Sequence, residues 1–242
     1  MIEVVAFDLD DTLWRESDAQ AHALAVLHHE WGVAAPLAAF GQVWREATGR
    51  LFDAFMDGRM THAEQRRGRI HALLAAFGQD SGEASVDRWT ERYVALYQEA
   101  WRAVPDAPQV LRRLSDMGLG LAVVTNGDGV QQRAKLERMG LGPWFPSVLI
   151  SGEVGAAKPD PVIFRRLVVE CGAPAASILF VGDRRDKDVE PARQMGMAAL
   201  QIDHTGRQRG PDVVHSLAAV VEWLERGRAA AEVGGTTASA AD

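Results

Sequence analysis

Two aspartates, Asp8 and Asp10, stand one residue apart directly after an apolar stretch at residues 2–7. In an extended strand residues i and i+2 project to the same side, so both carboxylates can face one reaction centre. Carboxylates this close resist ionising together unless a cation lies between them, so the pair predicts either separated pKa values or a bound metal ion. Asp8 could then serve as an ionised nucleophile or metal ligand, while Asp10, held protonated, donates to a leaving group. The alternative is an Asp-rich turn whose carboxylates only cap backbone amides.

A second cluster, Thr125, Asn126 and Gly127, closes the strand expected at residues 119–125. It offers a hydroxyl, an amide side chain and backbone N–H groups at the start of a helix, a combination that suits a phosphate oxygen. The alternative is a helix cap with a turn that glycine permits. Lys158 stands just before two prolines at the mouth of a further helix. It could stabilise charge on a carboxylate and on a phosphoryl group, or be a solvated surface lysine.

A third cluster consists of Asp183 and Asp188. Asp183 directly follows the apolar run 178–182, and Asp188 stands at the expected start of the next helix. Mg²⁺ prefers a few hard oxygen ligands and keeps several waters, so Asp8, Asp183 and a backbone carbonyl would be a sufficient protein ligand set. We expect Asp188 to be the amino-terminal cap of that helix and, at most, to support the metal ligands from the second shell.

The composition excludes several classes of protein. With 242 residues, 47% of them hydrophobic and 24% charged, the chain can bury a sizeable core. Its net charge of -7 argues against a nucleic-acid groove or an anionic membrane surface as the main partner. No apolar run reaches the roughly 18 residues needed to cross a bilayer. The only cysteine, Cys171, can form no internal disulfide, and the chain starts with a strand rather than a leader, so we expect cytoplasmic residence.

The pattern of apolar residues changes along the chain. Residues 18–101 show helical spacing throughout, punctuated by Pro36, Gly58, Gly78 and Gly82. From Pro105 onward strands alternate with helices, which is typical of a parallel sheet with crossover helices. The expected strands, besides the first, are 119–125, 148–151, 178–182 and 198–202. The expected helices between them are 107–117, 130–139, 161–171 and 188–195.

The first strand therefore belongs to the same α/β layer as the later strands, with a helical block inserted between them. We expect a catalytic core formed by residues 1–14 and 103–228, an all-helical cap at 15–102, and a flexible tail at 229–242 that is rich in small residues. A helical insertion just after the first strand would lie over the carboxyl edge of the sheet, where it could close on a substrate and exclude water.

The ordered set of motifs, from Asp8–Asp10 through Thr125–Gly127 and Lys158–Pro159 to Gly182–Asp183 with Asp188, resembles the haloacid dehalogenase superfamily of phosphohydrolases. The resemblance covers all of the sheet domain, and it is the order of the motifs at matching strand ends that makes it specific. It implies a Rossmann-like parallel sheet with a mobile helical cap inserted after the first strand, and a site that uses Mg²⁺.

The resemblance also implies roles for individual residues. Asp8 matches the nucleophile that forms an aspartyl-phosphate, and Asp10 matches the general acid that protonates the leaving oxygen and later activates water. Thr125 and Lys158 match the phosphate-binding and charge-balancing positions, with Asn126 and Gly127 beside the phosphate.

For the metal, the resemblance implies that Asp183 holds Mg²⁺ together with Asp8 and the main-chain carbonyl of Asp10, while Asp188 matches a further acid of the last motif. The dehalogenases of the superfamily lack an acid at the position of Asp10, so its presence favours phosphoryl transfer over dehalogenation. Arg184 stands where many relatives carry a small polar residue, and it is either a solvent-facing arginine or an added contact to phosphate or a partner.

The motifs, together with a helix that carries Gln131, Gln132, Lys135 and Leu136, resemble phosphatases of nucleoside monophosphates or acyl-sugar phosphates. Substrate choice should depend on the cap, most of whose arginines are expected to be solvated and its tryptophans to be core. The candidates are Arg45, Arg50, Arg66, Arg67, Trp44 and Trp14.

The leading hypothesis is a monomeric or homodimeric, Mg²⁺-dependent phosphomonoesterase that acts on a small phosphorylated metabolite, such as a nucleotide or a sugar phosphate, through an aspartyl-phosphate. A phosphotransferase or phosphomutase with the same nucleophile is the first alternative. A non-catalytic binding module that kept the fold is the second, although it predicts the loss of at least one of Asp8, Asp10, Lys158 and Asp183, all of which are present.

Overall fold

The computed structural model describes the backbone of residues 1–238 and the side chains of residues 1–229. The chain divides into two compact units. One consists of Met1–Arg15 together with the chain from Arg102 onward, and the other, which we call the helical unit, is Glu16–Trp101. Among the described residues no helix combines the length and the apolar character needed to span a membrane.

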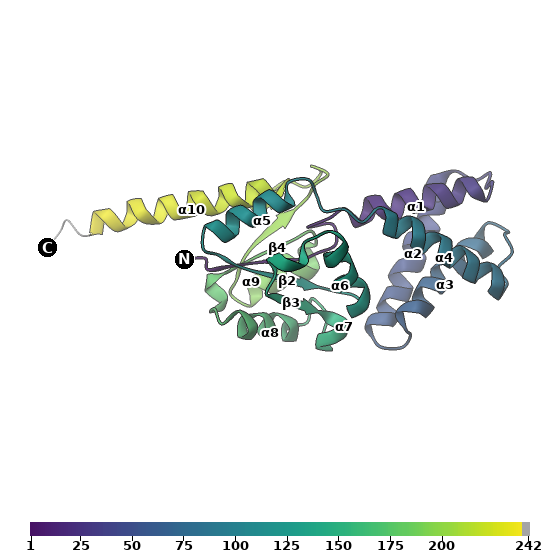
Figure 1. Cartoon of the computed structure of the whole chain (residues 1–242), viewed down its shortest axis with the longest axis horizontal. Coiled ribbons are helices and arrows are strands. Elements are labelled where there is room, and N and C mark those ends of the chain that lie inside the picture. Colours follow the sequence, from purple (N-terminus) through teal and green to yellow (C-terminus); the bar gives the residue numbers. More distant parts are fainter. Residues whose placement is uncertain (239–242) are drawn as a thin grey trace. The chain divides into compact units, whose positions relative to one another are not determined.

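The first unit is built on a six-stranded sheet in the order β3-β2-β1-β4-β5-β6. All the pairings between its strands are parallel, with β1 next to β2 and β4 in the interior of the sheet. The fold class predicted from the sequence, α/β with a Rossmann-like parallel sheet, is therefore confirmed (Figure 1). The strands are β1 Val4–Phe7, β2 Gly120–Thr125, β3 Ser147–Ile150, β4 Ile178–Gly182, β5 Ala198–Ile202 and β6 Val213–Val214.

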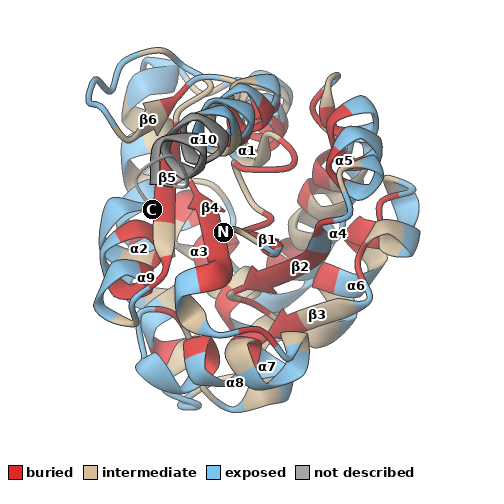
Figure 2. Cartoon of the chain, turned by 90° about the vertical axis from the view of Figure 1, so that its left-hand side faces the viewer, coloured by how far each residue is buried: buried red, intermediate tan, exposed pale blue. Residues whose placement is uncertain are grey.

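The central strands are apolar along their whole length because both faces of the sheet are covered. Every residue of β1 and β4 is buried, as is typical of parallel sheets packed between helices. Side chains alternate between the faces, so Val4 and Ala6 share one core cluster with Ile163, Phe164 and other residues of one helix layer. Figure 2 shows most of the strand residues coloured as buried, whereas the helices also carry exposed residues.

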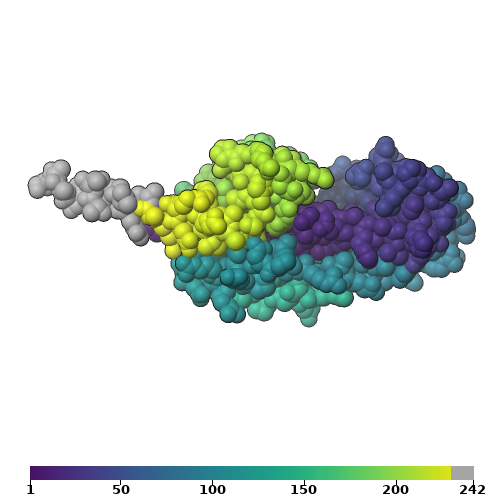
Figure 3. Space-filling model, turned by 90° about the horizontal axis from the view of Figure 1, so that it is seen from above, coloured from purple at the N-terminus to yellow at the C-terminus, as the bar shows by residue number. Residues whose placement is uncertain are grey.

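Helices connect the strands of this unit and cover the two faces of the sheet. Helix α8 packs against β2 and β3, whereas α5 packs against β2 (Figure 1). Helix α5 also packs against α10, and Figure 3 shows these two parts of the chain, in teal and yellow, side by side. Two of the helix starts follow local rules, since the side chains of Asp128 and Asp160 cap α6 and α8. The helices are α5 Ala107–Asp116, α6 Gly129–Arg138, α7 Ser151–Val154, α8 Pro161–Cys171, α9 Glu190–Gln194 and α10 Leu217–Ala238. Short turns of 3₁₀-helix at Gly142–Trp144 and Ala175–Ser177, and a π-helical turn at Arg185–Val189, complete the unit.

The helical unit contains helices only, as the spacing of apolar residues predicted. Thr61 and Glu64 form a reciprocal capping box at the start of its third helix, and Gly58 and Gly78 adopt positive φ values just after helices two and three. Aromatic side chains fill its interior, with the ring centroids of Trp44 and Tyr93 4.6 Å apart. Its helices are α1 Glu16–Glu30, α2 Leu37–Met56, α3 His62–Ala76 and α4 Glu83–Glu99.

The carboxyl-terminal part of the chain differs from the sequence-based expectation. Neither β6 nor α10 was predicted, because a two-residue strand carries almost no periodic signal and the segment after it is rich in alanine and glycine. The backbone of residues 229–238 belongs to α10, where the composition predicted a flexible tail. Residues 239–242 of the predicted tail lie outside the described residues.

Candidate active site

The polar clusters found in the sequence converge because their strands are neighbours in the sheet. Asp8 follows β1, Thr125 ends β2, and Asp183 follows β4, and these three strands lie side by side in parallel. Their carboxyl ends therefore form one edge, which is where open α/β sheets bind ligands. Residues that are more than a hundred positions apart in the sequence therefore lie together at this edge.

Lys158 lies between two carboxylates at this edge. Its Nζ donates to Oδ1 of Asp8 at 2.7 Å and to Oδ1 of Asp188 at 2.6 Å. All three side chains are almost fully buried, which removes the alternative of a solvated surface lysine. Burial alone would lower the pKa of Lys158, but the charges of Asp188 and Asp8 outweigh it and raise that pKa above its usual value. The lysine therefore stays positively charged beside the predicted nucleophile.

Asp183 brings a third carboxylate to the same place. One carboxylate oxygen each from Asp8, Asp183 and Asp188 lies within 4.8 Å of the others, a spacing at which they could hold one cation. Burial, followed by the charges of Asp8 and Asp188, raises the pKa of Asp183 to about 9. Burial also raises the pKa of Asp8 to about 7, against the opposing effect of Lys158. A single lysine thus leaves this acid cluster short of positive charge.

Asp188 does not cap a helix as the sequence predicted. It lies inside the π-helical turn Arg185–Val189, and its Oδ2 accepts the backbone N–H of Arg184 at 3.0 Å. Its carboxyl group packs so closely on Gly182 that a Cβ at that position would overlap with it. The wider π turn directs the carboxylate back toward the end of β4, and the glycine leaves the space that it occupies.

Asp10 lies in the loop after β1, because the extended strand ends at Phe7. The i, i+2 argument for Asp8 and Asp10 therefore does not describe how the loop brings the two acids together. Oδ1 of Asp10 accepts from Nε1 of Trp14 at 2.6 Å and from Nζ of Lys135 at 2.7 Å, and Oδ2 accepts from Nε2 of Gln132 at 3.0 Å. The acid is thus fixed by three donors on the first unit.

The predicted phosphate-binding run has several contacts that orient it. Thr125 is buried, and its hydroxyl oxygen accepts from Nε2 of Gln132 at 2.7 Å. The side-chain amide of Asn126 donates to the carbonyl of Lys158 and accepts its N–H, both at 2.8 Å. The backbone N–H of Gly127 donates to Oγ of Ser151 at 2.9 Å. Asn126 therefore holds the backbone of the lysine, and the hydroxyl of Thr125, which accepts from Gln132, can still donate.

Lys135 and Gln132 are site residues whose importance the sequence reading missed. Both occur in it only as parts of a helix that resembles certain phosphatases, yet both are fully buried and both contact Asp10. Their spacing of i and i+3 on α6 places them on one helix face, directly after the phosphate-binding run. A lysine on the apolar face of an amphipathic helix was the signal that could have identified them.

The arginines and tryptophans named from the sequence fall into different environments. Arg184 is the solvent-facing arginine of the two alternatives, since it is paired with the exposed Asp186 and its side chain is 55% exposed. Arg45 and Arg50 are exposed, Arg66 and Arg67 are half-buried, and Trp44 belongs to the core of the helical unit. Trp14 lies in the first unit against Asp10.

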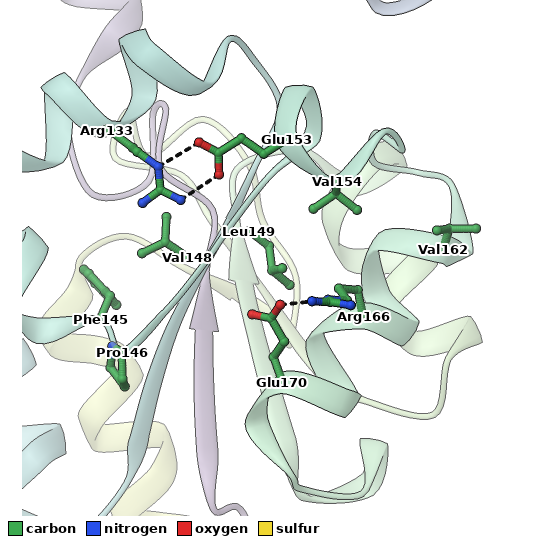
Figure 4. Close-up of a pocket in the computed structure, with 10 residues that line it drawn as sticks. All are labelled: Arg133, Phe145, Pro146, Val148, Leu149, Glu153, Val154, Val162, Arg166 and Glu170. Atoms are coloured by element: carbon green, nitrogen blue, oxygen red, sulfur yellow. Dashed lines mark hydrogen bonds and ion pairs between the residues drawn. The ribbon is translucent and has the colours of Figure 1, made fainter.

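A separate pocket of about 710 Å³ lies beside the edge strand β3 and contains none of these site residues. Two ion pairs line it, Arg133 with Glu153 and Arg166 with Glu170 (Figure 4). Because each charge there already has its partner, the pocket offers no free group for catalysis. The acid cluster at the carboxyl edge of the sheet is the better candidate site.

The chain is similar in sequence to known proteins over most of its length. A family model described as haloacid dehalogenase-like hydrolase matches residues 2–196. A glyceraldehyde 3-phosphate phosphatase from Methanocaldococcus jannaschii is 30% identical over 202 residues, which cover 84% of this chain and 85% of that protein. A phosphoserine phosphatase from Thermus thermophilus is 30% identical over 230 residues, covering 87% and 92% of the two chains.

Among solved structures, that of the putative HAD-hydrolase YfnB from Bacillus subtilis, bound to magnesium, has the same fold. It superposes with a TM-score of 0.72 at 23% identity and covers 92% of this chain and 98% of that one. The family match spans both units and every motif at the sheet edge from Asp8 to Asp188. The chain belongs to the haloacid dehalogenase-like hydrolases.

Proposed function

We propose that this protein is a Mg²⁺-dependent phosphomonoester hydrolase that acts on a small phosphorylated metabolite, such as a sugar phosphate or a nucleotide, through an aspartyl-phosphate on Asp8. The observation that carries the proposal is the buried cluster in which Lys158 bridges Asp8 and Asp188 beside Asp183. Relatives named as phosphatases of glyceraldehyde 3-phosphate and of phosphoserine support the substrate class. The free Cys171 suits a reducing compartment such as the cytoplasm.

The residues of the acid cluster fit a divalent cation. Asp8 and Asp183 would supply hard carboxylate oxygens, and their raised pKa values indicate that the cluster lacks positive charge without one. Asp188, whose two oxygens already accept from Lys158 and Arg184, would support the site from outside. When bound there, Mg²⁺ would neutralise phosphoryl oxygens so that an anionic carboxylate can approach phosphorus.

In the first step a carboxylate oxygen of Asp8 attacks phosphorus, and the bond from phosphorus to the ester oxygen breaks. The leaving oxygen takes a proton from Asp10, which becomes a carboxylate. Water then attacks the phosphorus of the aspartyl-phosphate, Asp10 takes up its proton, and the bond to Asp8 breaks to release phosphate. Lys158 and the hydroxyl of Thr125 stabilise charge on the phosphoryl oxygens, and Asn126 keeps the lysine in place.

The simplest test measures hydrolysis of p-nitrophenyl phosphate with Mg²⁺ and with an excess of chelator. We expect turnover with Mg²⁺, its loss with chelator, and its return when Mg²⁺ is added back in excess. Turnover that persists in chelator would contradict the role of the metal. Added glycerol distinguishes hydrolysis from phosphotransfer, because a phosphotransferase would form glycerol phosphate in preference to inorganic phosphate.

The effect of replacing Lys135 on the reaction rate should depend on how strongly the leaving group needs a proton. The Lys135→Met variant removes the buried cation that fixes Asp10, so kcat for an alkyl phosphate should fall at least about tenfold. With dinitrophenyl phosphate, whose leaving group needs no proton, the phosphorylation of Asp8 should stay close to the wild-type rate, measured as the pre-steady-state burst of dinitrophenolate. In an Asp10→Asn background the lysine substitution should have little further effect, as a double-mutant cycle would show. Equal losses of the phosphorylation rate for both substrates would contradict this positioning role.

A further inference from the structure

Two polar side chains at the carboxyl end of β5 bond to the loops that carry the acid cluster. Gln201 belongs to β5, and His204 stands two residues after the end of that strand. Gln201 is buried and His204 is half-buried. Polar groups are costly to bury unless they are hydrogen-bonded, so the partners of these two side chains indicate what they do.

Gln201 holds the loop after β4. Its Nε2 donates to the backbone carbonyl of Asp183 at 3.0 Å. The backbone of Gln201 is itself fixed, because its N–H donates to the carbonyl of Asp212, just before β6, at 2.8 Å. Oδ2 of Asp212 in turn accepts from Nη2 of Arg185, the first residue of the π-helical turn, at 2.8 Å. The carboxylate of Asp183 extends from this backbone, so the bond from Gln201 helps to set where that carboxylate points.

His204 bonds to the loop after β1, although β4 lies between β1 and β5 in the sheet. Its Nε2 lies 2.9 Å from the backbone carbonyl oxygen of Thr12. A carbonyl oxygen only accepts, so this ring nitrogen carries a proton and donates it to the bond. The hydroxyl of Thr12 donates to Oδ2 of Asp8 at 3.3 Å. His204 is therefore connected to the predicted nucleophile through one residue.

The loop that His204 holds has a backbone conformation that needs support. Asp11 adopts a φ of 55°, in the left-handed region that residues other than glycine rarely enter. Asp11 separates Asp10, the predicted general acid, from Thr12. The N–H of Thr12 donates to the carbonyl of Leu9 at 3.3 Å, which closes the turn on one side. Strained backbone persists where the surrounding structure fixes it, and the bond from His204 is one of the contacts that do so.

We propose that Gln201 and His204 are positioning residues, which hold the two loops so that the carboxylates of Asp8 and Asp183 keep the spacing at which they bind one divalent cation. Burial, and then the charge of Asp8, raise the pKa of Asp183, so the two carboxylates repel each other when both are ionised. The loops must therefore be held against this repulsion before the cation arrives. This inference rests on the proposed function, and it adds the part of the fold that fixes the metal ligands.

Calorimetric titration of the substrate-free protein with Mg²⁺ tests both residues. Gln201→Met keeps nearly the same length without the donor, and its Kd for Mg²⁺ should rise about tenfold. His204→Phe keeps a ring without the donor, and its Kd should rise by a similar factor. His204→Gln returns an N–H donor, so its Kd should lie within about threefold of the wild type. An unchanged Kd in Gln201→Met or in His204→Phe would overturn the assignment of that residue.

His215→Phe is the matched control. A ring nitrogen of His215, Nδ1, also lies 2.9 Å from a backbone carbonyl oxygen, but that oxygen belongs to Asp203, in the segment between β5 and β6. The Kd of this variant for Mg²⁺ should equal that of the wild type. A rise as large as that in His204→Phe would mean that any loosening of the segment weakens the metal site, and it would overturn the proposal.

Hydrogen exchange gives a readout that needs neither metal nor turnover. In chelator the backbone amides of residues 9–13 should exchange at least about fivefold faster in His204→Phe than in the wild type, while those of β4 and β5 keep their rates. In Gln201→Met the faster exchange should instead be confined to residues 183–188. Faster exchange throughout the sheet would indicate a loss of global stability and would overturn the positioning role.

These measurements also separate the inference from the proposed function. A wild type that hydrolyses no phosphate ester would contradict the proposed function. The inference would still hold if Gln201→Met and His204→Phe weaken Mg²⁺ binding and loosen only their own loops. An active wild type in which neither substitution changes Mg²⁺ binding would overturn the inference and leave the proposed function in place.

Discussion

Replacement of Asp8 by asparagine should lower kcat for phosphate ester hydrolysis at least about a thousand-fold, because the amide cannot form the covalent intermediate. Asp8 is 6% exposed and is held by Nζ of Lys158 at 2.7 Å and by the hydroxyl of Thr12 at 3.3 Å. Asparagine has nearly the same shape, and Lys158 keeps its contact with Asp188. Steady-state kinetics with p-nitrophenyl phosphate measures the loss.

The change should leave the fold intact, so the melting temperature should stay within about 4 °C of the wild type, which corresponds to about 1 kcal/mol. Asp186→Asn is the matched control, since it removes a carboxylate that is exposed and paired with Arg184. Its kcat should be close to that of the wild type. An Asp8→Asn enzyme with more than about a tenth of the wild-type activity would exclude Asp8 as the nucleophile.

Replacement of Asp183 by asparagine should abolish both the activity and the increase in melting temperature that Mg²⁺ produces in the wild type. A ligand that binds only the folded state stabilises it, and Asp183 is one of the carboxylates that would hold the cation. In chelator the variant should be at least as stable as the wild type, because a half-buried carboxylate that is repelled by Asp8 and Asp188 has been neutralised. Thermal denaturation with and without Mg²⁺ measures both effects.

The pH dependence of stability gives this second prediction a further test. In chelator, burial keeps a proton on folded Asp183 up to a pKa of about 9, whereas the ordinary value is 3.8. The unfolded chain therefore binds fewer protons between these values, and the free energy of unfolding should fall as the pH rises from about 4 to about 9. Asp8 adds to the slope up to its pKa of about 7. Asp183→Asn should flatten the slope, and an unchanged slope would contradict the assigned environment.

Much of the sheet could be predicted from the sequence, because a buried parallel strand must be apolar throughout and ends where polar residues begin. Residues 178–182 illustrate this, since the predicted strand coincides with β4. Helix boundaries followed from caps and glycines in the same way, as at Asp160 and Gly172 around α8. The two-residue strand β6 could not be predicted, because its pairing with β5 depends on residues distant in the sequence.

The chemistry of the site could be predicted only in part from the sequence. Asp8, Lys158 and Asp183 stand at strand ends or beside prolines, where local sequence signals exist. The position of Lys135 on an apolar helix face indicates burial but not its partner, because only the packing of α6 against the loop after β1 brings its Nζ to Asp10. The role of Asp188 was misjudged because a π-helical turn, which has no clear sequence signature, redirects its carboxylate.

The sequence by itself determined the elements of this protein, the order of its motifs and the identity of the groups that can carry charge, because these depend on residue types and short-range spacing. The tertiary structure alone decided which lysine meets which acid: Lys158 lies between Asp8 and Asp188, and Lys135 holds Asp10. It also decided that Arg69 is buried and that its Nε has no hydrogen-bond partner among the described residues. The physical reason is that burial and charge pairing are set by the packing of distant segments, which no local pattern encodes.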